Sequence, residues 1–306
     1  MTTLPPLKPV IDKYRTRISL QVKNLIENLD VKTTASAIKK QFYPQSLELE
    51  KTHEYFEDPL EEHTYMPHPQ ILHKYPHKFL WLITNECPVF CRYCTRKRRT
   101  LVKQKSDEIT QIELLTLIEQ YQINEVIFSG GDPFFLNIET LFNKIYYLKE
   151  LSQVHYIRFH SRCITTLTHK FNENFWSLWK KMSTDFPQQH FSIIMHINRV
   201  EEINSSALQV IKKFQERGVK MAVQAVLLKG VNDKVEHLHH LAHFLLKYDI
   251  HFYYLHQIDQ VAGSQHFFVS QQNGIELMQQ LRKMIPPHAM PRYVKDSKAG
   301  KINLYY

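Results

Sequence analysis

The sequence predicts an α/β fold built around a parallel sheet, and three observations lead to this prediction. From Phe79 onward, six short apolar runs resemble strands, and longer amphipathic stretches separate most of them. Parallel neighbours require crossover connections of this kind, which are right-handed in nearly all cases. Before this point, the first 78 residues show helical patterning instead. The 306 residues, 43% of them hydrophobic, suffice for one large domain with a small extension.

The N-terminal extension comes first in the chain. It carries helical stretches at 18–29 and 33–42, followed by a connection at 57–76 that is rich in Pro, His and acidic residues and has no clear strand. The expected strands then lie at 79–84, 125–130, 154–160, 191–197, 219–228 and 251–258. Helices are expected at 108–121, 138–151, 205–218 and 234–248. Such a sheet closes into a barrel or stays partly open, and in both forms ligands bind at the C-terminal strand ends.

Composition narrows the class of protein. No apolar run approaches the roughly 20 residues that span a bilayer, and "MTTLPPLKPVIDKYRTR" lacks the apolar middle of a signal peptide. We therefore expect a cytoplasmic protein with no membrane partner. In a reducing compartment its four cysteines favour a metal or catalytic site over disulfides. The net charge of +9 suits nucleic acid, an acidic protein or an anionic cofactor and does not choose among them.

Three of the cysteines, Cys87, Cys91 and Cys94, follow the first expected strand with the spacing C-x3-C-x2-C. A four-iron cluster normally takes four thiolates, so three leave one iron open. A structural zinc site needs a fourth ligand at short spacing, and the nearest histidines, His73 and His77, precede the strand. The pattern favours an iron–sulfur cluster, with three structural thiols or an incidental zinc knuckle as the alternative.

This spacing, with Tyr93 before the last cysteine, resembles the radical S-adenosylmethionine (SAM) superfamily. The resemblance implies a partial (β/α)6 barrel and a [4Fe-4S] cluster whose open iron binds SAM. It also implies a 5'-deoxyadenosyl radical, made with an electron from a donor such as flavodoxin or ferredoxin. The motif "SGGDP" follows the second expected strand, where the resemblance places it against the amino group of SAM; its residues are Ser129, Gly130, Gly131, Asp132 and Pro133. Paired glycines permit a close backbone approach to a ligand.

Further motifs over residues 57–304 resemble one branch of that superfamily, the lysine 2,3-aminomutase family. They include "CRYCTRKRR", "MHINRVEEI", "VQAVLLKGVND", "YYLHQIDQVAGSQHF" and "MPRYVKDSKAGKINL". The resemblance implies pyridoxal 5'-phosphate (PLP) as a second cofactor, bound covalently by Lys301. Only "SKAG" separates Lys301 from Asp296, where the family usually has a longer Gly-rich run. The positions near the PLP phosphate and ring are matched by Lys74, Tyr75 and Lys78.

The resemblance also implies the remaining site residues. Arg96 matches the residue that pairs with the substrate α-carboxylate, for which the planar guanidinium fork is suited. Asp259 and Asp296 match two carboxylates around the distal ammonium of lysine, a pair that selects against glutamate. SAM contacts are implied for His196 and Gln224.

The same passages contain residues for which no firm role is expected. Ser161 and Arg162 lie at a strand end and are further candidates for a ligand contact, whereas Cys163 is expected only to be buried. The charges of Lys97, Arg98 and Arg99 are expected to face solvent or phosphate.

The predicted function is a PLP-dependent radical SAM isomerase that converts L-lysine to β-lysine. The motif "LHQIDQVAGSQHF" and the end of the chain at "KINLYY" favour β-lysine for modification of elongation factor P, whereas "CTRKRR" is closer to the free-lysine mutases. Alternatives are an aminomutase for arginine, ornithine or glutamate, and an RNA-modifying radical enzyme. RNA-methylating radical enzymes of the dual-cysteine type need further reactive cysteines, and only Cys163 is left over. Nucleic acid is therefore not expected as a partner. The expected units are an extension at 1–78, a barrel core at 79–285 and a PLP-lysine segment at 286–306.

Overall fold

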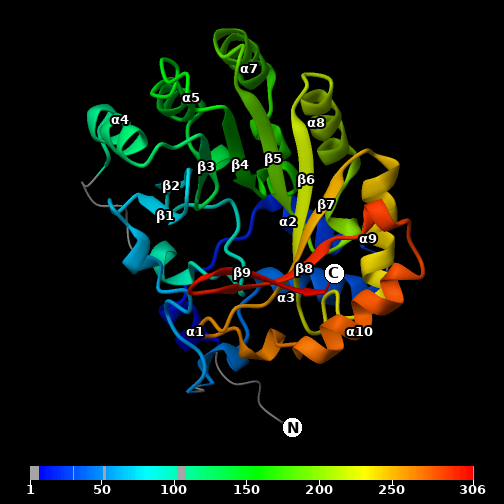
Figure 1. Ribbon diagram of the computed structural model, residues 1–306. Coiled ribbons are helices and arrows are strands. Elements are labelled where there is room, and N and C mark those ends of the chain that lie inside the picture. The colour runs from blue at the N-terminus through cyan, green and yellow to red at the C-terminus, as the bar shows by residue number, and fades with distance from the viewer. Residues whose placement is uncertain (1–6, 30, 51–52, 102–107, 306) are drawn as a thin grey trace.

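The computed structural model describes residues 7–29, 31–50, 53–101 and 108–305. Its centre is one nine-stranded sheet in which the strands are neighbours in chain order, from β1 to β9 (Figure 1). The strands are β1 (Ile71–Tyr75), β2 (Lys78–Thr84), β3 (Glu125–Gly130), β4 (Tyr156–Ser161), β5 (His190–His196), β6 (Lys220–Leu227), β7 (His251–Gln257), β8 (Arg292–Ser297) and β9 (Gly300–Tyr305). Strands β2 to β8 pair in parallel, and β1 and β9 pair antiparallel to their neighbours. The predicted α/β class with a partial barrel is confirmed, and β2 to β7 are the six predicted strands.

The expectation of no strand in residues 57–76 is wrong, because β1 occupies 71–75 and pairs with β2. Its sequence, "ILHKY", is short and half polar, so its strand character depends on a partner that only the fold supplies. The PLP-lysine segment likewise contains structure that the sequence did not reveal. There β8 and β9 form a hairpin joined by a tight turn, and Asp296 and Lys301 face each other across it.

Helices between the strands pack on the outer face of the sheet. They are α4 (Gln111–Gln120), α5 (Ile138–Tyr146), α6 (Cys163–Thr166), α7 (Glu173–Asp185), α8 (Ser205–Gln215), α9 (Val235–Lys247) and α10 (Gln271–Arg282). Their starts are fixed locally: Thr110 forms a capping box with Glu113, and Asn172 and Asn204 cap α7 and α8. A continuous hydrophobic core lies between these helices and the sheet. Because side chains alternate along a strand, the polar residues beside these apolar ones face the lumen of the barrel.

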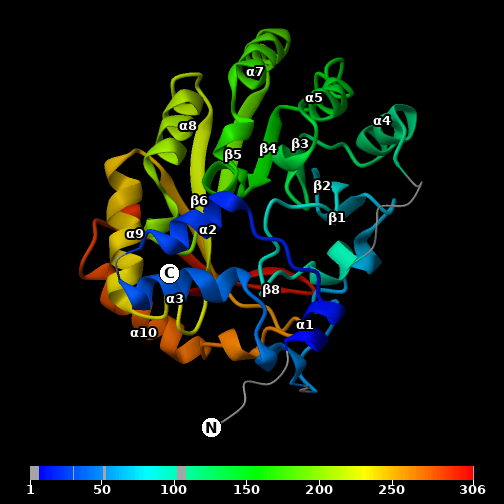
Figure 2. The ribbon, with the colours of Figure 1, turned by 180° about the vertical axis from the view of Figure 1, so that it is seen from behind.

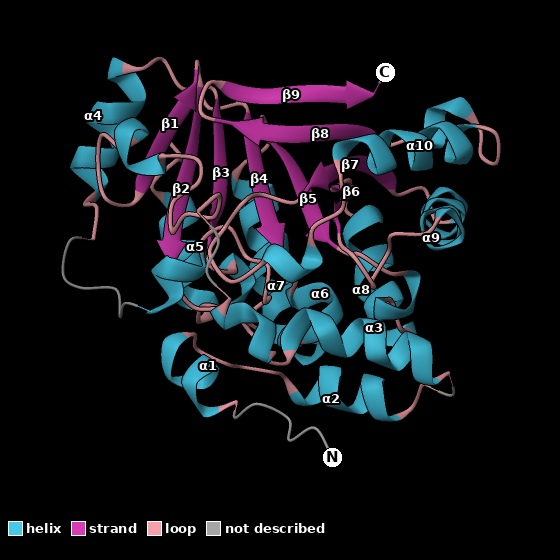
Figure 3. Ribbon diagram, turned by 90° about the horizontal axis from the view of Figure 1, so that it is seen from below, coloured by secondary structure: helices cyan, strands magenta, loops and turns pink. Residues whose placement is uncertain are grey.

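The N-terminal extension covers one end of the barrel. Its helices are α1 (Lys8–Lys13), α2 (Leu20–Glu27) and α3 (Lys32–Phe42). They lie in front of the strands in the rear view of Figure 2, on the side opposite β8 and β9. In Figure 3 the arrowheads of β2, β4 and β5 point toward this helical layer, whereas β8 and β9 run across the strands at the other side. The extension therefore packs at the carboxyl ends of the strands, where the cysteine motif begins.

Within the described ranges, no helix combines the length and the apolar character needed to cross a membrane.

Candidate active site

The three motif cysteines lie in the loop that follows β2 at the carboxyl end of the sheet. Each is partly exposed, and Cys94 N–H donates to the carbonyl of Cys91 at 3.2 Å. Burial raises the pKa of Cys87, and the neighbouring charges of Asp132, Cys94 and Cys91 raise it further, so the three thiols share one environment. Among the described residues, no three His, Cys, Asp or Glu side chains converge where a single metal ion would sit. Three neighbouring cysteine thiols are the kind of ligand that iron–sulfur clusters take.

The glycines of "SGGDP" have a packing role in this loop. Gly130 has φ +103°, and a Cβ there would lie 2.5 Å from the carbonyl oxygen of Thr84. A Cβ on Gly131 would overlap the carbonyl oxygen of Glu86, and Asp132 N–H donates to that same oxygen at 2.9 Å. The end of β3 therefore lies directly against the start of the cysteine loop. Ser129 is buried beside it.

The Asp132 carboxylate fixes the adjoining end of β4. One oxygen accepts from Ser161 Oγ at 2.8 Å and Phe134 N–H at 3.1 Å, and the other accepts from Arg162 N–H at 2.6 Å and Cys163 N–H at 3.0 Å. Four protein donors thus bind the Asp132 carboxylate, which belongs to the motif that was expected to contact SAM. This carboxylate positions Arg162. The expectation that Cys163 is buried is confirmed.

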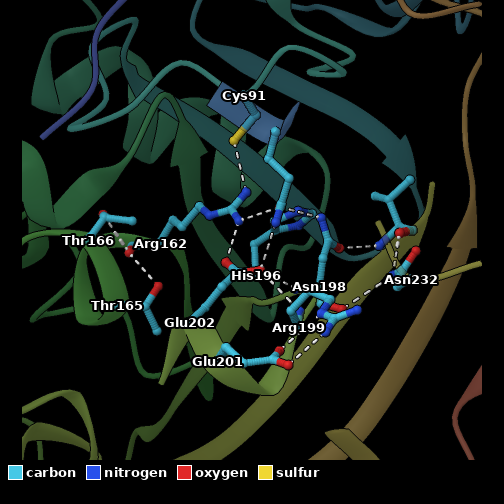
Figure 4. A network of polar contacts seen from close by, with 12 residues as sticks. Cys91, Arg162, Thr165, Thr166, His196, Asn198, Arg199, Glu201, Glu202 and Asn232 are labelled. Carbon is cyan, nitrogen blue, oxygen red and sulfur yellow. Dashed lines mark hydrogen bonds and ion pairs between the residues drawn. The ribbon is translucent and has the colours of Figure 1, made fainter. Parts of the chain in front are cut away.

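The Arg162 guanidinium is the centre of a buried polar network (Figure 4). Its Nη1 donates to Cys91 Sγ at 3.0 Å and to Tyr93 Oη at 2.6 Å. Its Nη2 donates to Gln41 Oε1 at 2.8 Å and pairs with the Glu202 carboxylate. The network therefore joins Cys91, one of the three motif thiols, to Gln41 in helix α3 of the extension. Hydrogen bonds to ligating sulfurs influence the properties of the metal group that they hold.

Tyr93, the aromatic residue of the cysteine motif, meets His196, a predicted SAM contact, in the same network. The Tyr93 Oη lies 2.8 Å from His196 Nε2 and accepts from Asn198 Nδ2 at 2.6 Å. His196 and Gln224 are register partners on β5 and β6, so both occupy one level of the barrel. Burial is the main cause that lowers the pKa of His196 well below its ordinary value, so the ring is neutral.

Basic residues within and after the cysteine motif bind the N-terminal extension. Arg92 is buried and pairs with Glu48, with Nη2 to Oε2 at 2.7 Å, and Lys97 Nζ lies 3.1 Å from the same carboxylate oxygen. Burial lowers the pKa of Lys97 to about 8, although Glu48 counteracts it. The expectation that Lys97 faces solvent or phosphate is wrong: it closes a buried ion cluster. Arg98 pairs with Asp58 and Glu62, and Arg99 Nη2 donates to the Pro69 carbonyl at 3.0 Å; their contacts lie within the protein too.

At the other end of the lumen, the β8–β9 hairpin holds Lys301 against β1. Lys301 N–H donates to Tyr75 Oη at 2.9 Å, and Lys74 Nζ donates to the Ser297 carbonyl. Lys78, at the start of β2, lies 3.5 Å from Glu125 and is half exposed. The structure thus brings Lys301, Lys74 and Tyr75 together despite the short "SKAG" turn.

Asp259 and Asp296 occupy the same lumen as Lys301. Asp259 accepts from Thr95 Oγ1 at 2.8 Å. Burial and the charge of Asp296 raise the pKa of Asp259 to about 6, while Lys301 and Arg96 oppose the increase. Two carboxylates and two cations therefore share one electrostatic environment. Arg96, for its part, pairs with Glu62, with Nη2 to Oε1 at 2.6 Å.

Two histidines that the sequence did not single out face this environment from β4 and β7. The Nε2 atoms of His160 and His256 are buried and have no hydrogen-bond partner among the described residues. Burial lowers the pKa of each ring, and Lys301 lowers it further. Two unpartnered imidazole nitrogens lie near the Lys301 amine. Such an arrangement suits a polar, anionic cofactor such as PLP. His160 precedes the candidate Ser161, but no motif marked it or His256.

Comparisons with known proteins show which superfamily this chain matches. The profile of the radical SAM superfamily matches residues 81–245. The chain is 33% identical to the L-lysine 2,3-aminomutase of Clostridium subterminale, over 86% of this chain and 62% of that protein. It is 30% identical to the L-lysine 2,3-aminomutase of Buchnera aphidicola subsp. Baizongia pistaciae, over 94% of this chain and 86% of that protein.

The chain belongs to the lysine 2,3-aminomutase family of radical SAM enzymes. The predicted resemblance and isomerase class are confirmed at the level of the family, and membership implies the [4Fe-4S] cluster and SAM. The chain is also 31% identical to the glutamate 2,3-aminomutase of Clostridioides difficile, over 96% of this chain and 68% of that protein. Its relatives therefore include aminomutases named for different amino acids. The chain spans about three fifths of the length of the Clostridium subterminale relative.

Proposed function

We propose that this protein is a PLP-dependent 2,3-aminomutase that converts L-lysine to β-lysine. The observation that carries the proposal is the pair of carboxylates, Asp259 and Asp296, in one lumen with Lys301 and Arg96. A lysine substrate has an anionic group at one end and a cationic group at the other. The lumen offers Arg96 for the first and the two carboxylates for the second.

The three cysteine thiols would hold the [4Fe-4S] cluster, which supplies the electron that cleaves SAM to the 5'-deoxyadenosyl radical. Around that position, the chain contributes a polar network centred on Arg162, a neutral His196 and the loop packed on Gly130. These groups orient the bound molecule and keep water out, since Arg162 and Tyr93 are buried. We further propose a one-electron donor of the flavodoxin or ferredoxin type as the partner for this end of the barrel.

At the hairpin end, Lys301 would hold PLP, which delocalises the unpaired electron of the substrate radical. Lys74 and Lys78 would supply point charges for its phosphate, without the bidentate fork of arginine. Tyr75 positions the backbone of Lys301. His160 and His256 present buried Nε2 atoms to the same space.

Glutamate is the second candidate substrate, because a glutamate 2,3-aminomutase is among the relatives. Its distal carboxylate would place a third anion beside Asp259 and Asp296, which is unfavourable in a buried site. The two aspartates therefore favour lysine. On the motif "LHQIDQVAGSQHF" we propose that the product serves modification of elongation factor P.

A substrate panel tests the proposal. The protein is reconstituted anaerobically with iron, sulfide and PLP, reduced in the presence of SAM, and incubated separately with lysine, ornithine, arginine and glutamate. β-Lysine from lysine, with little product from glutamate, supports the proposal. Turnover of glutamate in preference to lysine would contradict it, and an iron–sulfur protein that takes up no PLP would favour the RNA-modifying alternative.

A further inference from the structure

Arg96 is held by a buried carboxylate that belongs to a different part of the chain. Glu62 lies in a short 3-10 helix of the extension, η2 (Glu62–Tyr65), and its side chain is only 3% exposed. Its Oε1 accepts from Arg96 Nη2 at 2.6 Å, and its Oε2 accepts from Arg96 Nε at 3.3 Å. The carboxylate therefore occupies one edge of the guanidinium in a two-point contact.

The opposite edge of Arg96 remains available. Its Nη1 atom makes no hydrogen bond to any described residue, and the side chain is 23% exposed. A guanidinium has two edges that can each receive a planar carboxylate. One edge is thus filled by the protein, and the edge that carries Nη1 is accessible.

Glu62 is itself fixed by a second pair of charges. Its Oε2 also accepts from Arg98 Nη2 at 3.1 Å, and Arg98 Nη2 lies 2.9 Å from Asp58 Oδ1. The same Asp58 oxygen accepts from the backbone N–H of Glu62 at 3.2 Å. Two arginines and two carboxylates therefore offset each other's formal charge, and the arrangement fixes the direction of Arg96 instead of adding net positive charge.

We infer that Glu62 is a positioning residue for substrate recognition: it holds Arg96 so that the free edge of the guanidinium receives the substrate α-carboxylate. The inference rests on the proposed function, in which Arg96 binds that group. An arginine fixed before binding loses less rotamer freedom when the substrate arrives, so its hydrogen bonds contribute more to affinity.

The Glu62→Gln variant separates a positioning role from a purely electrostatic one, because the two roles predict opposite changes in the affinity for lysine. Removing the negative charge leaves Arg96 and Arg98 with one carboxylate fewer, so a purely electrostatic role predicts tighter binding of any carboxylate. A positioning role predicts weaker binding, because the amide cannot accept from Nε and Nη2 at once. We expect the Kd for lysine to rise about tenfold.

The measurement is the change in absorbance of the PLP-loaded protein on anaerobic titration with lysine, together with KM and kcat. The comparison ligand is 1,5-diaminopentane, which keeps both amino groups and lacks the carboxylate; its Kd should stay within about twofold. That ligand also shows that the variant is folded. Iron content should equal that of the parent, and KM should rise far more than kcat falls.

Glu61→Gln is the matched control, because this neighbouring glutamate is 43% exposed and pairs with Lys298, which is 64% exposed. Exposed pairs of this kind contribute little, so lysine binding should not change. In an Arg96→Gln background, Glu62→Gln should have no further effect on the Kd for lysine, since the residue acts through Arg96. Glu62→Asp, which keeps the charge at a shorter reach, should give an intermediate Kd.

Unchanged or tighter lysine binding by Glu62→Gln would overturn the inference, as would an equal loss for lysine and 1,5-diaminopentane. These outcomes are distinct from failure of the proposed function. If the parent rearranges another amino acid, that amino acid replaces lysine in the titration, because every α-amino acid presents the same carboxylate. A parent that binds no amino acid would contradict both statements.

Discussion

Lys301 Nζ donates to both carboxylate oxygens of Asp296, at 2.6 and 2.8 Å, from the position directly opposite on the β8–β9 hairpin. His256 Nδ1 lies 3.2 Å from the same carboxylate. Burial would raise the pKa of Asp296, but His256 and Lys301 outweigh it and hold the pKa well below its ordinary value. Asp296 is therefore ionised and already pairs with one ammonium. In the proposed function, a substrate ammonium at this carboxylate would share it with Lys301 or replace Lys301, so the hairpin would couple Lys301 to substrate binding.

Lys301→Ala should abolish covalent attachment of PLP and reduce turnover to background, because Lys301 is the proposed PLP lysine and the hairpin holds it beside Asp296 and Tyr75. The check is borohydride reduction of the PLP-loaded protein followed by peptide mapping. Lys298→Ala is the control and should still be labelled, since Lys298 pairs with Glu61 at the surface. A reduced adduct on Lys298 in the parent protein would show that the assignment is wrong.

Asp296→Asn and Asp259→Asn should each weaken binding of lysine, because removing one partner leaves a partly desolvated ammonium with a single carboxylate. The loss is of order 3 to 5 kcal/mol where water is excluded and smaller where water enters. Norleucine, which lacks the distal ammonium, is the matched ligand, and its affinity should not fall. If Asp296→Asn binds lysine as the parent does, Asp259 alone anchors the distal end.

Lysine affinity should depend on pH through Asp259, whose pKa burial raises to about 6. The carboxylate must be ionised to pair with the ammonium, so the Kd for lysine should rise as pH falls through about 6. Asp296, Lys301 and Arg96 face Asp259, and Asp296 stays ionised over this range. Asp259→Asn should lose this acidic limb in a titration between pH 5 and 7.5. A limb that persists in the variant would assign it to another group.

Cys91→Ala should lose the cluster and keep the fold, because three thiolates are the minimum set for this type of site. Cys163→Ala should retain iron, since Cys163 is buried outside the loop that holds the motif. Iron content and visible absorbance of both proteins after anaerobic reconstitution provide the comparison. Equal iron in Cys91→Ala and the parent would remove Cys91 from the ligand set.

Glu48→Gln should destabilise the fold strongly, because Glu48 is fully buried with Arg92 and Lys97 as its partners. Breaking a buried pair by removing one charge costs about 3 to 5 kcal/mol. The exposed neighbour Glu50 is the control, and Glu50→Gln should change stability by less than about 0.5 kcal/mol. Denaturant unfolding of the two variants measures the difference. Equal stabilities would mean that the extension is not held through this cluster.

The parallel strands β2 to β7 could be predicted from the sequence, because each contains an apolar run, as in "FLWLIT" and "FSIIMHI". The sequence did not reveal β1, β8 and β9, which carry polar residues such as Lys74, Asp296 and Lys301. These residues form strands because a neighbouring strand accepts their hydrogen bonds, and pattern alone does not reveal that neighbour.

In the candidate site, the motifs pointed to the cysteines, Tyr93 and Lys301, whose roles stay predictions, but they could not reveal how charges are paired. Lys97 follows three residues after Cys94 in a basic run that resembles a solvated surface, yet it is buried against Glu48, far earlier in the chain. Glu62 gave no signal, because its meaning depends on Arg96, which the fold brings beside it. Long-range ion pairs of this kind require the tertiary structure.

In the proposed reaction, nitrogen moves from C2 to C3 of lysine within this barrel. The most direct test feeds L-[2-15N]lysine to the anaerobically reconstituted, reduced enzyme with SAM and determines by NMR where the label resides. We predict β-lysine with 15N on C3 and none of the label released as ammonia. Unlabelled β-lysine, or cleavage of SAM without any β-lysine, would contradict this reaction.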